Sequence, residues 1–318
     1  MLRRLALLCL AACLAAPVLA ADAAKVLRIA LDDITSLDPQ QGTDLYSTRV
    51  TMHIFEGLYE FDYLASPARV VPNTAEALPV ITDGGRTWTI RIKRGIRFTD
   101  DPAFGGKPRE LVAEDYVYAI KRWLDPNLRN GGEPTLTDLI EGARPAVDAA
   151  RKPGAKFDYD VKISGLQATD RHTLVLRLTK PDYTMLERLA VLPSFAVARE
   201  AIEAAGKDVM ARPVGTGPFA LKEWVRSARV VLEANPHYRR VTFPESGDPR
   251  HKALIAQMKG RTFPALARIE ISIIPEAGSE YLTFEQGNLD FTSLSGSIAP
   301  RALDGTKLKP GLAGRGIV

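Results

Sequence analysis

The spacing of apolar and polar residues predicts a mixture of short strands and helices. Strands are expected where residues alternate or are rich in β-branched types, and helices where apolar residues recur three and four positions apart. The expected strands are Val26–Leu31, Trp88–Lys93, Val161–Leu166, Thr173–Leu178, Phe219–Val225, Arg229–Ala234 and Ile269–Ile274, with another starting at Leu289–Phe291. The expected helices are Thr43–Tyr59, Ala113–Leu124, Tyr183–Val191, Ala198–Ala205 and Ser279–Gln286. This mixture indicates an α/β protein.

Two stretches show no long periodic pattern. Residues 127–156 are rich in glycine, proline and charge, and are expected to form a loop with one short helix near Leu136–Ile140. Residues 237–265 are basic and are expected to be irregular. Most of the expected helices and strands therefore lie before residue 127, between residues 157 and 236, and after residue 265.

Length and composition are those of an ordinary folded protein. The 318 residues correspond to about two domains, and 46% apolar with 25% charged residues argues against disorder. The net charge of +4 is a small difference between 42 basic and 38 acidic residues that are interspersed along the chain. No nucleic-acid partner is expected, because such proteins usually gather positive charge on one face.

The first twenty residues read as a secretory signal peptide. Arg3 and Arg4 precede an apolar run, Leu5–Ala16, that is too short to span a bilayer, and small residues precede a cut at Ala21. Cleavage predicts a periplasmic protein and removes both cysteines, Cys9 and Cys13. An alternative is lipid anchoring at Cys13, because Leu10–Cys13 resembles a lipoprotein cleavage box.

No motif for catalysis, a cofactor or a metal is found. Without cysteine and with isolated histidines there is no zinc-site spacing, and neither a nucleophile elbow nor a phosphate-binding loop occurs. Residues Gly215–Ala220 match the consensus of a dinucleotide-binding loop in sequence, but Pro218 lies inside the match and a strand, not a helix, is expected to follow it. Two classes stay open: a ligand-binding module of the cell envelope and an exported hydrolase with scattered catalytic residues.

Several motifs, taken in order, resemble the family 5 extracellular solute-binding proteins, the periplasmic peptide receptors of ABC importers. Each motif is weak alone, but their succession and spacing over residues 26–296 are specific. They are Ser36–Pro39 with Phe55–Leu58, Thr82–Trp88 with Ile90–Phe98 and Ala113–Tyr118, Val214–Phe219 with Asn235–Tyr238, and Phe284–Phe291.

The resemblance implies a two-lobed periplasmic-binding-protein type II fold of cluster C with an inserted extra domain. Lobe I would comprise residues 25–58 and 173–270, and the extra domain residues 59–172. Residues 271–318 would give the hinge and the start of lobe II, most of which is expected to be missing. The strand Ile269–Ile274 is then expected to lack cover for its apolar face.

The implied function is capture of a short peptide between lobes that close by a hinge, and its delivery to an inner-membrane ABC permease. The receptor is expected to be a monomer and not an enzyme. Other solutes that the family implies are a nickel chelate, haem or an oligosaccharide, and they stay open because the discriminating residues are not present.

The resemblance also implies where ligand contacts fall. The loop before the Phe55–Leu58 helix and the strand after Gly287 supply contacts in peptide receptors, and a third region within Asn127–Thr137 aligns too poorly to name a residue. The implied ligand-binding residues are Thr43, Asp44, Leu45, Thr292, Ser293, Leu294 and Ser295. One departure is Val112, which stands where the family has a threonine, so the N-cap of the following helix is expected to be missing or moved.

Overall fold

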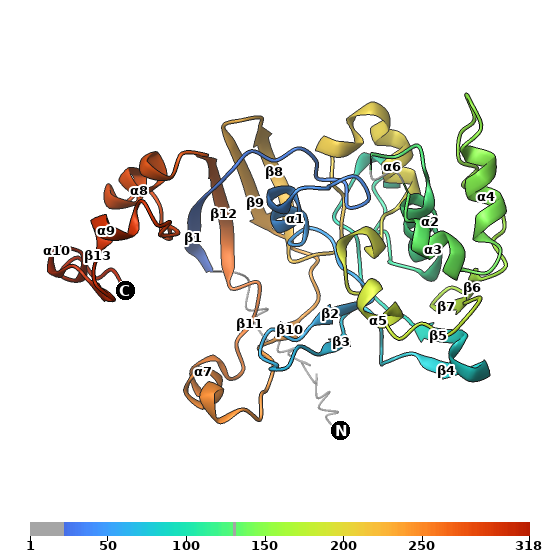
Figure 1. Ribbon diagram of the computed structural model, residues 1–318, viewed down its shortest axis with the longest axis horizontal. Helices are drawn as coiled ribbons and strands as arrows, with labels where there is room; N and C mark the ends of the chain where they lie inside the picture. Colours follow the sequence, from blue (N-terminus) through green and yellow to red (C-terminus); the bar gives the residue numbers. More distant parts are fainter. Residues whose placement is uncertain (1–21, 130–131) are drawn as a thin grey trace, which may run out of the picture.

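A computed structural model describes residues 22–129 and 132–318 of the protein (Figure 1). The predicted leader Met1–Ala20, with Cys9 and Cys13, lies outside the described residues. Within the described part, no helix combines the length and the apolar character needed to cross a membrane.

The first sheet joins one strand from the start of the chain to three from its second half. Its order is β1-β12-β9-β8, in which β1 and β12 run parallel and the other neighbours antiparallel. The strands are β1 (Asp22–Leu31), β8 (Phe219–Val225), β9 (Arg229–Ala234) and β12 (Leu266–Ile273). The hairpin of β8 and β9 has the bounds that the sequence predicts.

One face of this sheet is buried against helix α1 (Leu45–Thr51) and the residues that follow it. Val230, Leu232, Ile269 and Ile271 are nearly inaccessible on that face. The expectation that Ile269–Ile274 lacks cover is therefore wrong, because β12 lies between β1 and β9 and its apolar residues are enclosed by the chain that is present.

Helix α1 is shorter than the predicted Thr43–Tyr59. Beyond Thr51 the carbonyl groups of His53 and Ile54 accept hydrogen bonds from Phe219 and Gly217, at 3.0 and 2.8 Å. These carbonyls accept hydrogen bonds from a distant segment instead of from the next turn of a helix. The helical spacing of apolar residues therefore continues beyond the point where the helix ends.

The second sheet is antiparallel, in the order β4-β5-β7-β6. Helix α2 (Ala113–Leu124) has its predicted bounds and contacts β6 and β7. Helices α3 (Pro134–Leu139) and α4 (Ala143–Ala150) lie beside it, and α4 falls where the sequence predicted loop (Figure 1). The strands are β4 (Val80–Thr82), β5 (Thr87–Arg91), β6 (Leu166–Asp170) and β7 (Thr173–Arg177).

Two sequence expectations change around this sheet. The strand expected at Val161–Leu166 begins only at Leu166, because Gly165 lies against the main chain of Glu141, whose carbonyl accepts its N–H at 2.8 Å. The division proposed at residues 172 and 173 would separate β7 from β5 and β6, with which it pairs. We propose that the inserted unit extends at least to Arg177.

Smaller elements connect the two sheets. The strand pair β2–β3 lies near the projecting pair β10–β11, where the Tyr63 and Phe243 rings meet edge to face with centroids 6.1 Å apart. The region expected to be irregular therefore contains two short strands and a helix. The bounds are β2 (Tyr59–Phe61), β3 (Val70–Pro72), α5 (Met185–Arg188), α6 (Arg199–Ala205), β10 (Val241–Thr242), α7 (Lys252–Met258) and β11 (Thr262–Phe263).

The C-terminal segment forms a small unit at the end of the molecule opposite α4 (Figure 1). Its own core contains Tyr281, Ile298, Ala302 and Leu312. The elements are α8 (Ala277–Glu285), α9 (Ala299–Ala302), β13 (Leu303–Asp304), β14 (Lys307–Leu308) and α10 (Pro310–Ala313). The strand expected to start at Leu289–Phe291 does not form.

Candidate functional site

The loop before α1 contains the first three predicted contact residues. Thr43 and Leu45 are exposed, whereas the carboxylate of Asp44 caps the helix. It accepts hydrogen bonds from Ser47 N at 2.7 Å and from the hydroxyls of Ser47 and Thr35, both at 2.6 Å. Partial burial opposes ionisation, but these hydrogen bonds lower the pKa of Asp44. The side chain of Asp44 therefore holds the loop in shape, while Thr43 and Leu45 face solvent.

The other four predicted contact residues follow α8. Thr292 donates its hydroxyl hydrogen bond to Glu280 Oε1 at 2.8 Å, and Ser293, Leu294 and Ser295 are exposed. The carbonyl of Ser295 accepts from the backbone N–H of Ile298 and of Ala299, which starts the turn into α9. The segment is thus an open loop anchored at both ends rather than a strand.

Interaction with the Asp32 carboxylate raises the pKa of Tyr46, which follows Leu45 directly, and the negative charge of Glu280 adds to that shift. Glu280 is the partner of Thr292 in the second loop. The third region, Asn127–Thr137, includes residues 130–131, which lie outside the described residues.

A buried carboxylate that the sequence did not single out joins several motifs behind these loops. Glu56 accepts hydrogen bonds from Thr216 Oγ1 at 2.9 Å, from Tyr238 at 3.2 Å, and from Arg239 Nη1 at 2.6 and 2.7 Å. Desolvation of Arg239 lowers its pKa, but the negative charge of Glu56 has the opposite effect, and the pKa of Arg239 is raised overall. The order of the motifs along the chain was the only sequence signal for this cluster.

The Gly215–Gly217 turn packs against the end of the α1 segment. A β-carbon on Gly215 would lie 2.0 Å from the Ile54 carbonyl oxygen, and one on Gly217 would lie 2.7 Å from the His53 carbonyl oxygen. These glycines permit two main chains to touch. The structure confirms a turn leading into a strand at this place and offers no helix to receive a nucleotide phosphate.

A second buried pair ties the first sheet to α2. Arg122 Nη2 donates to Asp38 Oδ2 at 2.5 Å, and Gln41 Nε2 donates to the same oxygen at 2.7 Å. Both members of the ion pair are at most 3% exposed in their side chains. Arg122 Nε and Nη1 and Gln40 Oε1 are buried and make no hydrogen bond with the described residues. This pair places the Ser36–Pro39 motif against the inserted unit.

Helix α2 begins without a side-chain acceptor at its N-cap, as the sequence predicts for Val112. The reciprocal half of a capping box is present, because Val112 N donates to the Asp115 carboxylate at 2.8 Å. Asp115 is held in turn by Arg109, whose Nη2 lies 2.6 Å from Asp115 Oδ1. One free N–H of the first turn is therefore satisfied from within the helix.

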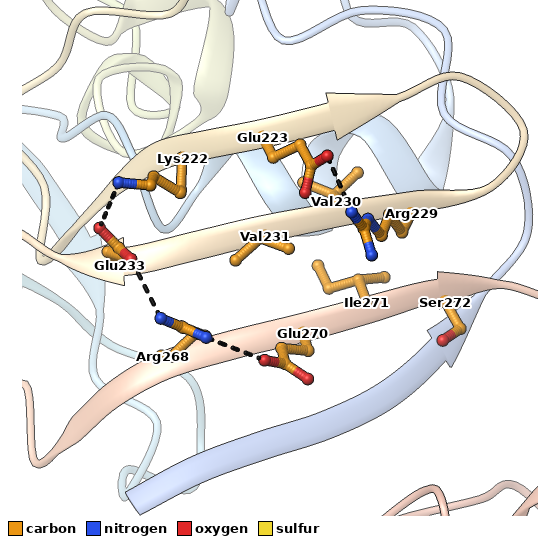
Figure 2. Close-up of a pocket in the computed structure, with 10 residues that line it drawn as sticks. All are labelled: Lys222, Glu223, Arg229, Val230, Val231, Glu233, Arg268, Glu270, Ile271 and Ser272. Atoms are coloured by element: carbon orange, nitrogen blue, oxygen red, sulfur yellow. Dashed lines mark hydrogen bonds and ion pairs between the residues drawn. The ribbon is translucent and has the colours of Figure 1, made fainter. Parts of the chain in front are cut away.

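A depression of about 420 Å³ lies on the solvent side of the first sheet (Figure 2). Charged side chains cross its floor as a chain of ion pairs, from Lys222 to Glu233 at 3.5 Å and from Arg268 to Glu233 and Glu270, both at 3.3 Å. These charges pair with one another, and none of the seven predicted contact residues lines the depression. We therefore describe it as the polar outer surface of the sheet and not as the candidate ligand site. Among the described residues, no group of three or more His, Cys, Asp or Glu side chains could hold a metal ion.

Comparison with known proteins gives the family. The pattern of the bacterial extracellular solute-binding proteins, family 5 Middle, matches residues 69–314. The chain belongs to the family 5 solute-binding proteins. The sequence resemblance is thereby confirmed.

Individual relatives agree with this family. The periplasmic oligopeptide-binding protein OppA of Salmonella typhimurium is 30% identical over 230 residues, which cover 69% of this chain and 37% of OppA. Heme-binding protein A of Haemophilus influenzae is 25% identical over 264 residues, which cover 81% of this chain and 40% of the relative. The chain therefore spans well under half the length of these relatives.

Solved structures show the fold. Listeria monocytogenes OppA bound to peptide superposes with a TM-score of 0.67 at 21% identity, covering 89% of this chain and 49% of that protein. The α/β architecture is thus that of the two-lobed family 5 periplasmic binding proteins, and the chain spans about half the length of these structures.

Proposed function

We propose that the protein is a non-enzymatic periplasmic receptor that captures short peptides and delivers them to an inner-membrane ABC permease. The observation that carries this proposal is membership of family 5 together with relatives named for binding oligopeptides and dipeptides. The whole receptor would act as a monomer, with the ligand held between two lobes.

The two exposed loops are suited to such a ligand. Thr43–Leu45 and Thr292–Ser295 offer main-chain groups, and Thr43, Ser293 and Ser295 add exposed small polar side chains. Backbone hydrogen bonds to an extended peptide would supply affinity without reading its sequence, much as an added strand does. Water in roomy side-chain pockets would allow many residue types.

Haem is a second candidate solute, because the match to Heme-binding protein A covers more of this chain than the match to OppA does. A porphyrin would need a broad apolar slot. Leu45, Phe291 and Leu294 are exposed apolar side chains near the candidate loops, and they could line one side of it.

Calorimetric titration of the whole receptor distinguishes between these solutes. We expect saturable one-to-one binding of an equimolar pool of tripeptides and tetrapeptides, no binding of haemin, and unchanged peptide when the mixture is later examined by mass spectrometry. Acetylated peptides of the same composition serve as a control for amino-terminal recognition. Cleaved peptide without stoichiometric binding would support the exported hydrolase instead, and haemin binding alone would support the haem receptor.

A further inference from the structure

Arg28, in β1, forms an ion pair with Asp290, which lies 262 positions later in the chain. Its Nη2 donates to Asp290 Oδ1 at 2.6 Å, and its Nε donates to Asp290 Oδ2 at 3.2 Å. Its Nη1 donates to the Gly287 carbonyl at 3.0 Å. A guanidinium that meets both oxygens of a carboxylate fixes the orientation of its partner as well as its distance.

The main chain joins the same two residues. Arg28 N donates to Asp290 Oδ2 at 2.7 Å, and Asp290 N donates to the Arg28 carbonyl at 2.8 Å. The pairing mimics a β-bridge in which a carboxylate oxygen replaces the carbonyl of a strand. The outer edge of β1 is therefore closed at Arg28, and the expected strand at Leu289–Phe291 gives way to a single paired residue.

This contact is connected through the chain to both candidate ligand loops. Asp290 precedes Thr292 by two residues, so its position decides where the second loop begins. Strand β1 leads to Thr35, whose hydroxyl donates to Asp44 in the first loop at 2.6 Å. The hinge residue Ile274 is attached to the same strand, because its N–H donates to the Leu31 carbonyl at 2.9 Å. Strand β1 is thus a common frame for both loops.

We infer that Arg28 and Asp290 form a latch that sets the position of Thr292–Ser295 relative to Thr43–Leu45, which makes them positioning residues for ligand capture. The inference rests on the proposed function, because it assumes that these loops meet the ligand. The hydrogen bond from Arg28 also lowers the pKa of Asp290, which keeps the carboxylate charged.

Hydrogen–deuterium exchange and peptide titration together test the latch. In Arg28→Ala we expect the amide of Asp290, whose N–H donates to the Arg28 carbonyl, to exchange about tenfold faster and the pool of tripeptides and tetrapeptides to bind about tenfold more weakly. Arg229→Ala is the matched control, because Arg229 is another arginine of the same sheet with a carboxylate partner, Glu223, at 2.9 Å. Arg28→Lys should restore part of both effects, and the melting temperature should stay within the range of the control.

The two measurements separate the latch from the proposed function. Unchanged exchange of the Asp290 amide in Arg28→Ala would overturn the latch, whether or not peptide binds. Faster exchange with an unchanged peptide affinity would overturn the positioning role. If the parent protein binds no peptide, the proposed function fails, and the exchange comparison between the two alanine variants still supports or overturns the latch.

Discussion

Glu56 shows how one buried charge can hold several distant parts of the chain. Its side chain is 5% exposed and receives hydrogen bonds from Thr216 and Tyr238, which belong to two motif segments, and from Arg239, which follows the second segment directly. A buried carboxylate is costly to desolvate, so its value depends on keeping all of these partners. The recurrence of the motifs at fixed positions thus has a physical reason at the scale of one residue.

Replacing Glu56 by glutamine should destabilise the protein by about 3 kcal/mol, because it removes the buried carboxylate that pairs with the part-buried Arg239. Urea unfolding followed by tryptophan fluorescence measures the change. Glu270→Gln is the control, since Glu270 pairs with Arg268 at 3.3 Å on the exposed sheet face and should cost less than about 1 kcal/mol. Equal losses in the two variants would show that the Glu56 cluster contributes no more than a surface pair.

At the scale of elements, the sequence predicted what local patterns determine. Helix α2 and the β8–β9 hairpin have their predicted bounds, because their apolar spacing agrees with the faces they bury. Helix α4 was missed because it lies in a stretch rich in glycine, proline and charge, and α7 was missed because it buries none of its residues and so shows no apolar face. Periodicity could not reveal the end of α1, where contacts with Gly217 and Phe219 replace helical hydrogen bonds.

The candidate site was less accessible from sequence than the fold. The seven contact residues came from family resemblance, and their role stays a prediction. An Asp before a helix is a local capping signal that Asp44 fits, since it accepts from Ser47 N three residues later. Nothing local indicates that Glu280 holds Thr292 or that Asp290 pairs with Arg28, because these residues come together only in the completed tertiary structure.

The Gly215 turn gives a prediction at this scale. Alanine at Gly215 should cost about 3 kcal/mol, because its β-carbon would lie 2.0 Å from the Ile54 carbonyl oxygen and would force the α1 segment away from β8. Gly296→Ala is the control, since no atom lies within 4 Å of a β-carbon built there. Denaturant midpoints compare the two variants, and a Gly215→Ala midpoint equal to that of the control would contradict the close packing.

For the whole molecule, α2 decides whether the two sheets behave as one folding unit. Tyr116 and Val117 contribute to the core of the second sheet, whereas Tyr118 and Ala119 contribute to the core of the first. The buried pair of Arg122 and Asp38 adds a polar tie between the same two parts. The C-terminal unit differs, because its separate core has four buried residues and it meets the first sheet through the Ile274 N–H bond to the Leu31 carbonyl and the Arg28 latch.

Both sheets should therefore melt in a single calorimetric transition, since a helix shared by two cores cannot lose one without exposing the other. Asp38→Asn should lower the midpoint of the entire transition by roughly 8 °C, the equivalent of about 3 kcal/mol, because it leaves Arg122 buried and unneutralised. Asp248→Asn, at a surface pair with Arg250, should shift it by less than about 3 °C. Separate transitions for the two sheets in the parent protein would show that α2 does not couple them. Early hydrogen–deuterium exchange confined to α8–α10 is expected, because the small core of these helices can open while the two sheets stay folded.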